Sequence, residues 1–196
     1  VYKRQQQEQF AYESHIKSSK AVSDGNFSDE LIEINSDSAS VSDDGCIRFE
    51  PSIEAMSGLR PVFSDSGTVT AATSSPLTDG ATALIVCSEE FASSHGLQPL
   101  VRIVSGTATG CKPELMGMGP VSATQKVLEN ANWEIDSVDL FEINEAFSSQ
   151  SLAVISELGI DIGRVNIDGG AISIGHPLGA SGARITGKAA SLLNRT

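Results

Sequence analysis

Two loops of this sequence carry side chains whose types could do chemistry. The first is Phe141-Glu-Ile-Asn-Glu-Ala-Phe147, which contains Asn144, and the second contains His176. An imidazole suits proton transfer near neutral pH, and its Nε2–H can donate to a developing oxyanion. An asparagine NH2 group can hold a water or a substrate oxygen. The two loops therefore favour chemistry in which negative charge develops on a substrate oxygen.

The loop around His176 is built to bring backbone close to a ligand. Five of the fifteen residues from 168 to 182 are glycine, which allows positive φ and close approach. Pro177 follows the histidine and restrains its backbone. We therefore expect His176 to be functional. His15 and His95 stand in polar, helix-like segments and are expected at the surface.

Asn144 has a second interpretation. It stands between an expected strand and an expected helix, where asparagine is among the best N-caps. Glu145 would then lie in the first helical turn, where a carboxylate favours the positive end of the helix. On this interpretation Asn144 only caps a helix, and the sequence alone leaves both possibilities open.

The three cysteines are not placed like nucleophiles. Cys87 ends an apolar run and is expected to be a small core residue. Cys46 and Cys111 lie in loop-like contexts without a neighbouring base. The widely spaced, odd set makes a disulfide framework and a zinc ribbon unfavourable and favours a reducing compartment. No metal site is expected.

These residues need a scaffold, and the pattern of the chain predicts an α/β one. Short apolar runs predict buried strands at residues 83–88, 100–108, 138–143 and 165–167. Helical spacing of apolar residues predicts helices at 5–20, 89–95, 120–130, 145–158 and 180–193. Alternating strands and helices pair in parallel, with the chemistry at the strand-to-helix loops.

Composition excludes several classes of partner. The chain has 196 residues with 13 Lys+Arg against 25 Asp+Glu, a formal net charge of −12. Much of that charge lies in residues 23–54, which are expected to form a solvated, partly mobile surface region. A pI near 4.5 argues against nucleic acid and anionic membranes as partners. No apolar run is long enough to predict a membrane span.

The motifs closely resemble those of thiolases, enzymes that make or cleave 3-ketoacyl-CoA. Asn144-Glu-Ala-Phe147 resembles the NEAF motif of the family, and Gly169-Gly-Ala-Ile-Ser-Ile-Gly-His-Pro-Leu-Gly-Ala-Ser-Gly-Ala-Arg184 resembles its glycine-rich signature. The similarity continues through Leu59-Arg-Pro-Val-Phe63, Gly67-Thr-Val-Thr70 and Met116-Gly-Met-Gly-Pro120. It covers nearly the whole chain.

The resemblance implies a layered αβαβα thiolase fold that is incomplete. Residues 1–76 would form a loop-domain remnant with CoA contacts. Residues 77–98 would be the last strand and helix of the N-terminal domain, and 99–196 a truncated C-terminal domain. The chain resembles the C-terminal half of a thiolase, and the two catalytic cysteines of the family match none of its three. We therefore expect the isolated chain to be inactive and poorly soluble.

In the whole enzyme the resemblance implies ping-pong acyl transfer through a cysteine acyl-enzyme. His176 would activate the nucleophile, and with a water held by Asn144 it would stabilise the thioester enolate. CoA contacts carried over by position are Arg48, Phe63, Ala71 and Ser75, and the pocket for the acyl group and thioester would be lined by Met116, Ala146 and Phe147.

The resemblance further implies CoA and acyl-CoA as substrates, no permanently bound cofactor, and a parent homodimer or homotetramer. Localisation would be cytoplasmic in a bacterium and mitochondrial or peroxisomal in a eukaryote. Two other interpretations stay open. One is a decarboxylating, ketosynthase-like condensing enzyme, which shares the fold but lacks the motif at Asn144. The other is a non-catalytic thiolase-like module that binds acyl-CoA or a partner subunit.

Overall fold

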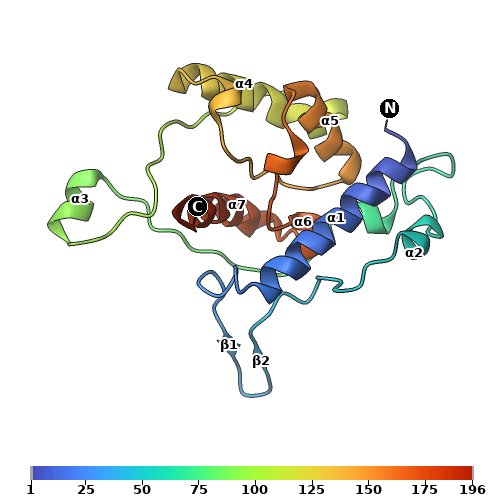
Figure 1. Cartoon of the computed structure of the whole chain (residues 1–196), viewed down its shortest axis with the longest axis horizontal. Helices are drawn as coiled ribbons and strands as arrows, with labels where there is room; N and C mark the ends of the chain where they lie inside the picture. The colour runs from blue at the N-terminus through green and yellow to red at the C-terminus, as the bar shows by residue number, and fades with distance from the viewer. Residues whose placement is uncertain (1, 196) are drawn as a thin grey trace.

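The structure is a computed structural model that describes residues 2–195. Val1 and Thr196, the outer limits of the first and third expected domains, lie outside the described residues. Helices α1 (Arg4–Ser23), α5 (Ser148–Leu158), α6 (Ala171–Ile174) and α7 (Leu178–Arg195) form the centre of the molecule. Figure 1 shows α1 running past α5 and α6, and both of these helices contact it.

Helix α1 is more central than its polar sequence suggests. A helix was expected at residues 5–20, and the structure confirms it with slightly longer bounds. The face toward α5 and α6 buries Phe10 and Ala11 together with the hydroxyls of Ser14 and Ser18. A polar helix face can be buried in this way because its side chains find hydrogen-bond partners on the neighbouring elements.

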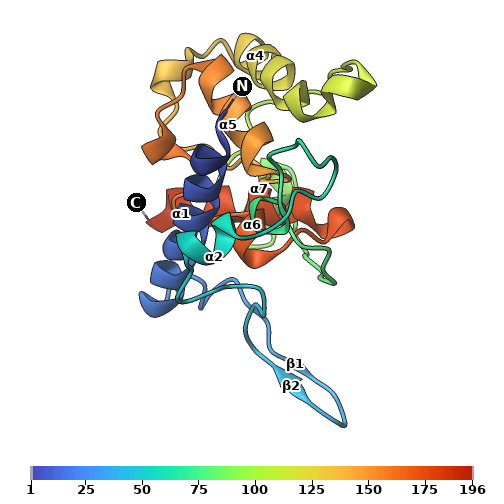
Figure 2. The same ribbon diagram turned by 90° about the vertical axis from the view of Figure 1, so that its right-hand side faces the viewer.

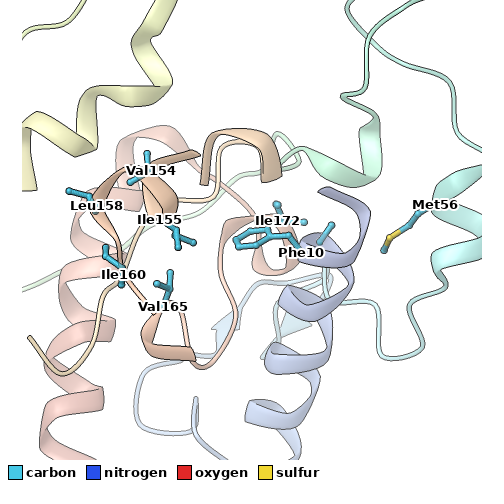
Figure 3. Packing of buried hydrophobic residues seen from close by; sticks show 9 residues of the cluster. Phe10, Met56, Val154, Ile155, Leu158, Ile160, Val165 and Ile172 are labelled. Carbon is cyan, nitrogen blue, oxygen red and sulfur yellow. The ribbon is translucent and has the colours of Figure 1, made fainter. Parts of the chain in front are cut away.

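The hydrophobic core lies where α5 and the segments after it meet α1. Figure 3 shows its side chains converging from several elements, with Met56 of α2 (Ile53–Ser57) on the far side of α1. The buried members of this cluster are Phe10, Ala11, Met56, Val154, Ile155, Leu158, Ile160, Val165 and Ile172.

The other predicted helices are present, one with a shifted start, whereas α2 and α6 were not predicted. Helices α3 (Glu89–Ser94) and α4 (Gly119–Ala131) lie where they were predicted. Short 3-10 turns occur at η1 (Ala71–Thr73), η2 (Pro113–Met118), η3 (Ile135–Ser137) and η4 (Ile162–Arg164). Helix α5 begins at Ser148 instead of residue 145, and Phe147 is its N-cap. Asn144 is therefore not a helix cap, and Glu145 does not lie in a first helical turn.

The expected strands are largely absent from the described part of the chain. The sheet there is the antiparallel hairpin of β1 (Ile34–Asn35) and β2 (Ser40–Val41), which projects away from the helices in both Figure 1 and Figure 2. Of the predicted parallel pairing, one bridge joins Phe141 to Val165. Residues 83–88 and 100–108 form no ladder within 2–195, since a strand needs a hydrogen-bonded neighbour.

The two unpaired segments flank α3, which Figure 1 shows apart from the other helices. Their apolar side chains are exposed, and Ile85 retains 88% of its surface. Cys87 is also exposed, so its assignment to a buried core is wrong. Apolar runs of this kind are typical of strands covered on both faces, yet residues 83–88 are exposed in the described part of the chain, where Leu84 approaches Gly187 of α7. Among residues 2–195, no helix combines the length and the apolar character needed to cross a membrane.

Candidate active site

The structure brings the two candidate catalytic side chains together. Asn144 Nδ2 lies 3.3 Å from His176 Nε2, although the residues are 32 positions apart in the chain. The Nδ2 nitrogen can only donate, so Asn144 donates this hydrogen bond to the imidazole nitrogen. The Oδ1 atom of Asn144 is buried and has no hydrogen-bond partner within residues 2–195. Both side chains therefore belong to one site.

The other imidazole nitrogen fixes the tautomer of His176. His176 Nδ1 lies 2.6 Å from Ser181 Oγ, and that hydroxyl donates to the carbonyl oxygen of Pro177 at 3.1 Å. Since the hydroxyl has one proton to give, Ser181 Oγ accepts from Nδ1–H. This network assigns the lone pair to Nε2, which is the nitrogen that accepts from Asn144. Ser181 was not among the residues expected at the site, although its position one helical turn after Pro177 could have indicated it.

The surroundings of His176 keep it neutral. Desolvation by burial, and then the positive charge of Arg184, lower the pKa of His176 below its usual value. The Nε2 lone pair is thus available at neutral pH. Close to this site, burial raises the pKa of Glu142 to about 8, although Arg184 lowers it. Glu142 is consequently mostly protonated at pH 7, and the carboxylates of Glu145 and Asp44 also act on the charge of Arg184.

Asn166 holds the backbone that leads into Asn144. Its Oδ1 accepts from Ile143 N–H at 2.8 Å, and its Nδ2 donates to Ile143 O at 2.8 Å. Asn166 has a positive φ of 45°, which asparagine tolerates better than most residues. Together with the bridge between Phe141 and Val165, these contacts fix the end of the segment immediately before Asn144.

The glycine before His176 is required by packing as well as by backbone conformation. Gly175 has a φ of +99°, and a Cβ atom on it would lie 2.8 Å from Thr78 Oγ1. This supports the sequence-based argument for close approach in this loop. It also brings the segment around Thr78 beside the loop of His176.

Four of the expected CoA and pocket residues lie beside Asn144. Ser75 donates from its backbone N–H to Ala146 O at 3.0 Å and from its hydroxyl to the same oxygen at 3.2 Å. Phe63 and Phe147 form an edge-to-face pair with ring centroids 5.8 Å apart. Phe63 remains 73% exposed, so most of its ring can meet a ligand.

The other expected binding residues do not join this group. Arg48, Ala71 and Met116 are exposed, and no hydrogen bond or ring contact in residues 2–195 links their side chains to Asn144 or His176. The backbone N–H of Arg48 donates to His15 Nδ1 at 3.2 Å.

His15 itself corrects an expectation. It was predicted at the surface, but it is only 4% exposed, whereas His95 is exposed as predicted. Burial, and then the charge of Arg48, lower the pKa of His15 to about 4. A polar helix sequence did not indicate that this face packs against the segment leading to Arg48.

Neither a thiol nor a metal completes the site in the described part of the chain. Cys46 is half-buried and Cys87 and Cys111 are exposed, and none forms a hydrogen bond with His176 there. In residues 2–195 no three His, Cys, Asp or Glu side chains gather in a group that could hold a metal ion.

Two models of known protein families match the chain. The family model for the thiolase C-terminal domain matches residues 97–196, and the model for the thiolase N-terminal domain matches residues 2–90. The chain belongs to the thiolase family. The expected partial α/β thiolase fold is likewise confirmed by solved structures.

Relatives of known name include acyltransferases of two kinds. The chain is 46% identical over 186 residues to an acetyl-CoA acetyltransferase of Paracoccus denitrificans, covering 93% of this chain and 48% of that protein. It is 45% identical over 192 residues to a 3-ketoacyl-CoA thiolase of Hahella chejuensis, covering 93% and 49%.

Solved structures agree. The acetyl-CoA acetyltransferase of Bacillus anthracis superposes with a TM-score of 0.91 at 42% identity, covering 98% of this chain and 49% of that one. The human mitochondrial 3-ketoacyl-CoA thiolase in complex with CoA gives 0.92 at 40% identity, covering 98% and 48%. This chain thus spans about half the length of the thiolases it matches.

Proposed function

We propose that this chain supplies the enolate-stabilising part of a thiolase active site, which acts on 3-ketoacyl-CoA and CoA. The observation that carries the proposal is the 3.3 Å contact between Asn144 Nδ2 and His176 Nε2. A ketone cleavage that releases acetyl-CoA must pass through an enolate, whose oxygen needs preorganised hydrogen-bond donors. An imidazole and an amide at one point can provide them.

In the degradative direction His176 acts first as a base. Its Nε2 lone pair accepts the proton of a cysteine thiol, and the thiolate attacks C3 of the substrate. The C2–C3 bond then breaks, and its electron pair moves into the enolate of acetyl-CoA. His176 Nε2–H and a water held by Asn144 donate to the enolate oxygen. An acid protonates C2, acetyl-CoA leaves, and the same group, now a base, takes the proton of a CoA thiol. The CoA thiolate then takes the acyl group and releases the cysteine thiolate, to which His176 returns the proton.

The attacking thiol would come from a part of the enzyme other than this chain's own cysteines. Cys46, Cys87 and Cys111 make no hydrogen bond to His176 within residues 2–195, which supports that assignment. The reverse Claisen condensation would use the same groups, because the same enolate is then the nucleophile.

CoA would bind along the segment that meets Asn144 and Ala146. Ser75, Phe63 and Phe147 are contiguous with the site, as the hydrogen bonds to Ala146 and the ring contact indicate. We propose that Phe63 and Ser75 contact CoA and that Ala146 and Phe147 line the thioester pocket. Arg48 and Ala71 would extend the CoA site and Met116 the acyl pocket. The human mitochondrial 3-ketoacyl-CoA thiolase was solved in complex with CoA, which supports CoA as co-substrate.

The test removes each donor in the complete enzyme that carries this chain. Asn144→Ala should lower kcat for thiolysis of acetoacetyl-CoA by about 10²–10³-fold, the typical effect of losing one oxyanion donor. His176→Ala should lower it further, because it also removes the base. The measurement is the rate of loss of the 3-ketoacyl-CoA absorbance.

His95→Ala is the matched control, since this histidine is exposed and lies outside the site. The control should retain the parent rate. If Asn144→Ala and His176→Ala both stay within twofold of it, the proposed function is wrong, and a binding module without catalysis becomes the better interpretation.

A further inference from the structure

We propose that Glu145 is a positioning residue that holds the loop of Asn144 against the loop of His176. This inference rests on the proposed function, because positioning matters only if those two side chains act on the substrate. Glu145 is 1% exposed, so its carboxylate cannot touch the substrate directly. Glu145 follows Asn144 immediately in the chain, so a displacement of Glu145 also displaces Asn144.

Three donors from three different segments converge on the Glu145 carboxylate. Oε2 accepts from Ser14 Oγ of α1 at 2.7 Å and from Ile172 N–H of α6 at 3.1 Å. Oε1 accepts from Asn166 Nδ2 at 2.8 Å. Helix α6 ends two residues before His176. One carboxylate therefore joins both catalytic loops and anchors them to α1.

The glycine at the start of α6 provides a second, independent sign of this close approach. A Cβ atom on Gly170 would lie 2.4 Å from the carboxyl carbon of Glu145 and 2.5 Å from its Oε1. Gly170 has a φ of −149°, which any residue adopts. The requirement for glycine thus comes from the carboxylate and not from the backbone conformation.

The site requires a carboxylate rather than an amide. In a Glu145→Gln variant, an NH2 group at Oε1 would face the NH2 of Asn166, and at Oε2 it would face Ile172 N–H. Asn166 cannot turn its amide without losing both of its hydrogen bonds to Ile143. Either orientation leaves two donors opposed in a buried place, which is costly, and the loops must move apart to relieve it.

The consequence for catalysis is selective. Asn144 enters only the steps that form or consume the enolate, whereas His176 also activates the thiol. Glu145 lies one residue from Asn144, while Ile172 lies four residues before His176. Displacement of the carboxylate should therefore impair carbon–carbon cleavage more than acetyl exchange between acetyl-CoA and labelled CoA, because that exchange forms no enolate.

The experiment compares Glu145→Gln and Gly170→Ala with the complete parent enzyme. Both should lower kcat for thiolysis of acetoacetyl-CoA by about 10–100-fold, the scale expected for a misplacement of about 1 Å. KM for CoA should stay within about threefold, as for loss of an effect confined to the transition state. Acetyl exchange should fall by a clearly smaller factor than thiolysis.

Two controls match the substitutions. Glu157→Gln changes an exposed carboxylate on α5, and Gly45→Ala adds a Cβ where no atom lies within 4 Å. The positioning role is overturned if Glu145→Gln and Gly170→Ala match these controls, or if thiolysis and exchange fall by the same factor. If Asn144→Ala and His176→Ala lose thiolysis but Glu145→Gln and Gly170→Ala do not, the proposed function stands and the positioning role of Glu145 is wrong.

Discussion

At the scale of single residues, the site depends on which nitrogen of His176 carries the proton. Ser181 Oγ accepts a hydrogen bond from Nδ1–H and donates one to Pro177 O, so Nε2 carries a lone pair that faces Asn144. The same atom can accept a thiol proton and then donate it to an oxyanion. A histidine in a glycine-rich loop could be recognised in the sequence, whereas its tautomer depends on a partner that folding supplies.

The lowered pKa of His176 predicts the acid side of the pH profile. Burial and the Arg184 charge disfavour the imidazolium, and the unprotonated form is the base that we propose. Activity should therefore be present above the pKa of His176 and lost as pH falls through it. The acid limb of kcat/KM for thiolysis should lie below about 6.5, the ordinary pKa of histidine.

Arg184→Gln should move the acid limb to higher pH, toward the ordinary pKa of histidine, because it removes one of the two causes of the lowered pKa of His176. Glu142 would not become an unpaired carboxylate near pH 7, since its pKa is already raised to about 8. Arg102→Gln, a change at an exposed arginine, is the control and should leave the limb in place. An acid limb at or above 6.5 in the parent enzyme would contradict the assignment.

At the scale of elements, α1 fixes the glycine-rich loop through hydroxyl groups. Ser18 Oγ donates to Asp168 O at 3.0 Å, and Ser14 Oγ accepts from Gly170 N–H at 3.2 Å. The helices could be predicted because their apolar spacing is local in sequence. The burial of serines on α1 could not, because it depends on a loop about 150 residues away in the chain.

Gly169 is the position where this packing leaves no room. It has a φ of +83°, and a Cβ there would lie 1.9 Å from Ser18 Oγ and 2.7 Å from Ser14 O. Gly169→Ala should lower the free energy of unfolding by about 2–4 kcal/mol through strain and overpacking. Urea denaturation of the complete enzyme measures this.

The double variant Ser18→Ala, Gly169→Ala separates the two causes. It removes the nearer clash but keeps the positive φ and the contact with Ser14 O, so most of the loss should remain. Gly45→Ala should cost far less, because its Cβ would meet no atom within 4 Å. Full recovery in the double variant would show that backbone strain at Gly169 is unimportant.

At the scale of the whole molecule, a large apolar surface lies along residues 83–88 and 100–108. Ile85 is 88% exposed, Val86 70% and Ile103 58%. Exposed apolar patches and unpaired backbone favour association with other chains. The relatives that match this chain are about twice as long. Their remaining half can cover segments of this kind, which explains why these segments have the apolar sequences of buried strands.

The isolated 196-residue chain should accordingly associate and bind an apolar dye such as ANS. Ile85→Lys combined with Ile103→Lys should reduce both, because charges on the two segments oppose edge pairing. Ile162→Lys, at a half-exposed residue of η4, is the control and should have little effect. Light scattering and dye fluorescence report the outcome. A monodisperse chain without dye binding would contradict the prediction.

The five longer helices and the two loops that carry Asn144 and His176 could be predicted from the sequence, because helical periodicity and glycine–proline patterns act over a few residues, whereas the short helices α2 and α6 were not predicted. Tertiary contacts, in contrast, bring Asn144 to His176 instead of placing it at a helix cap, bury His15, and join three segments at Glu145. These outcomes depend on contacts between residues 21 to 131 positions apart, from the pair of Asn166 and Glu145 to that of Ser14 and Glu145, and no local pattern encodes such contacts. The prediction of strands at 83–88 and 100–108 was wrong for the same reason, since a strand forms only when a neighbouring strand completes its hydrogen bonds.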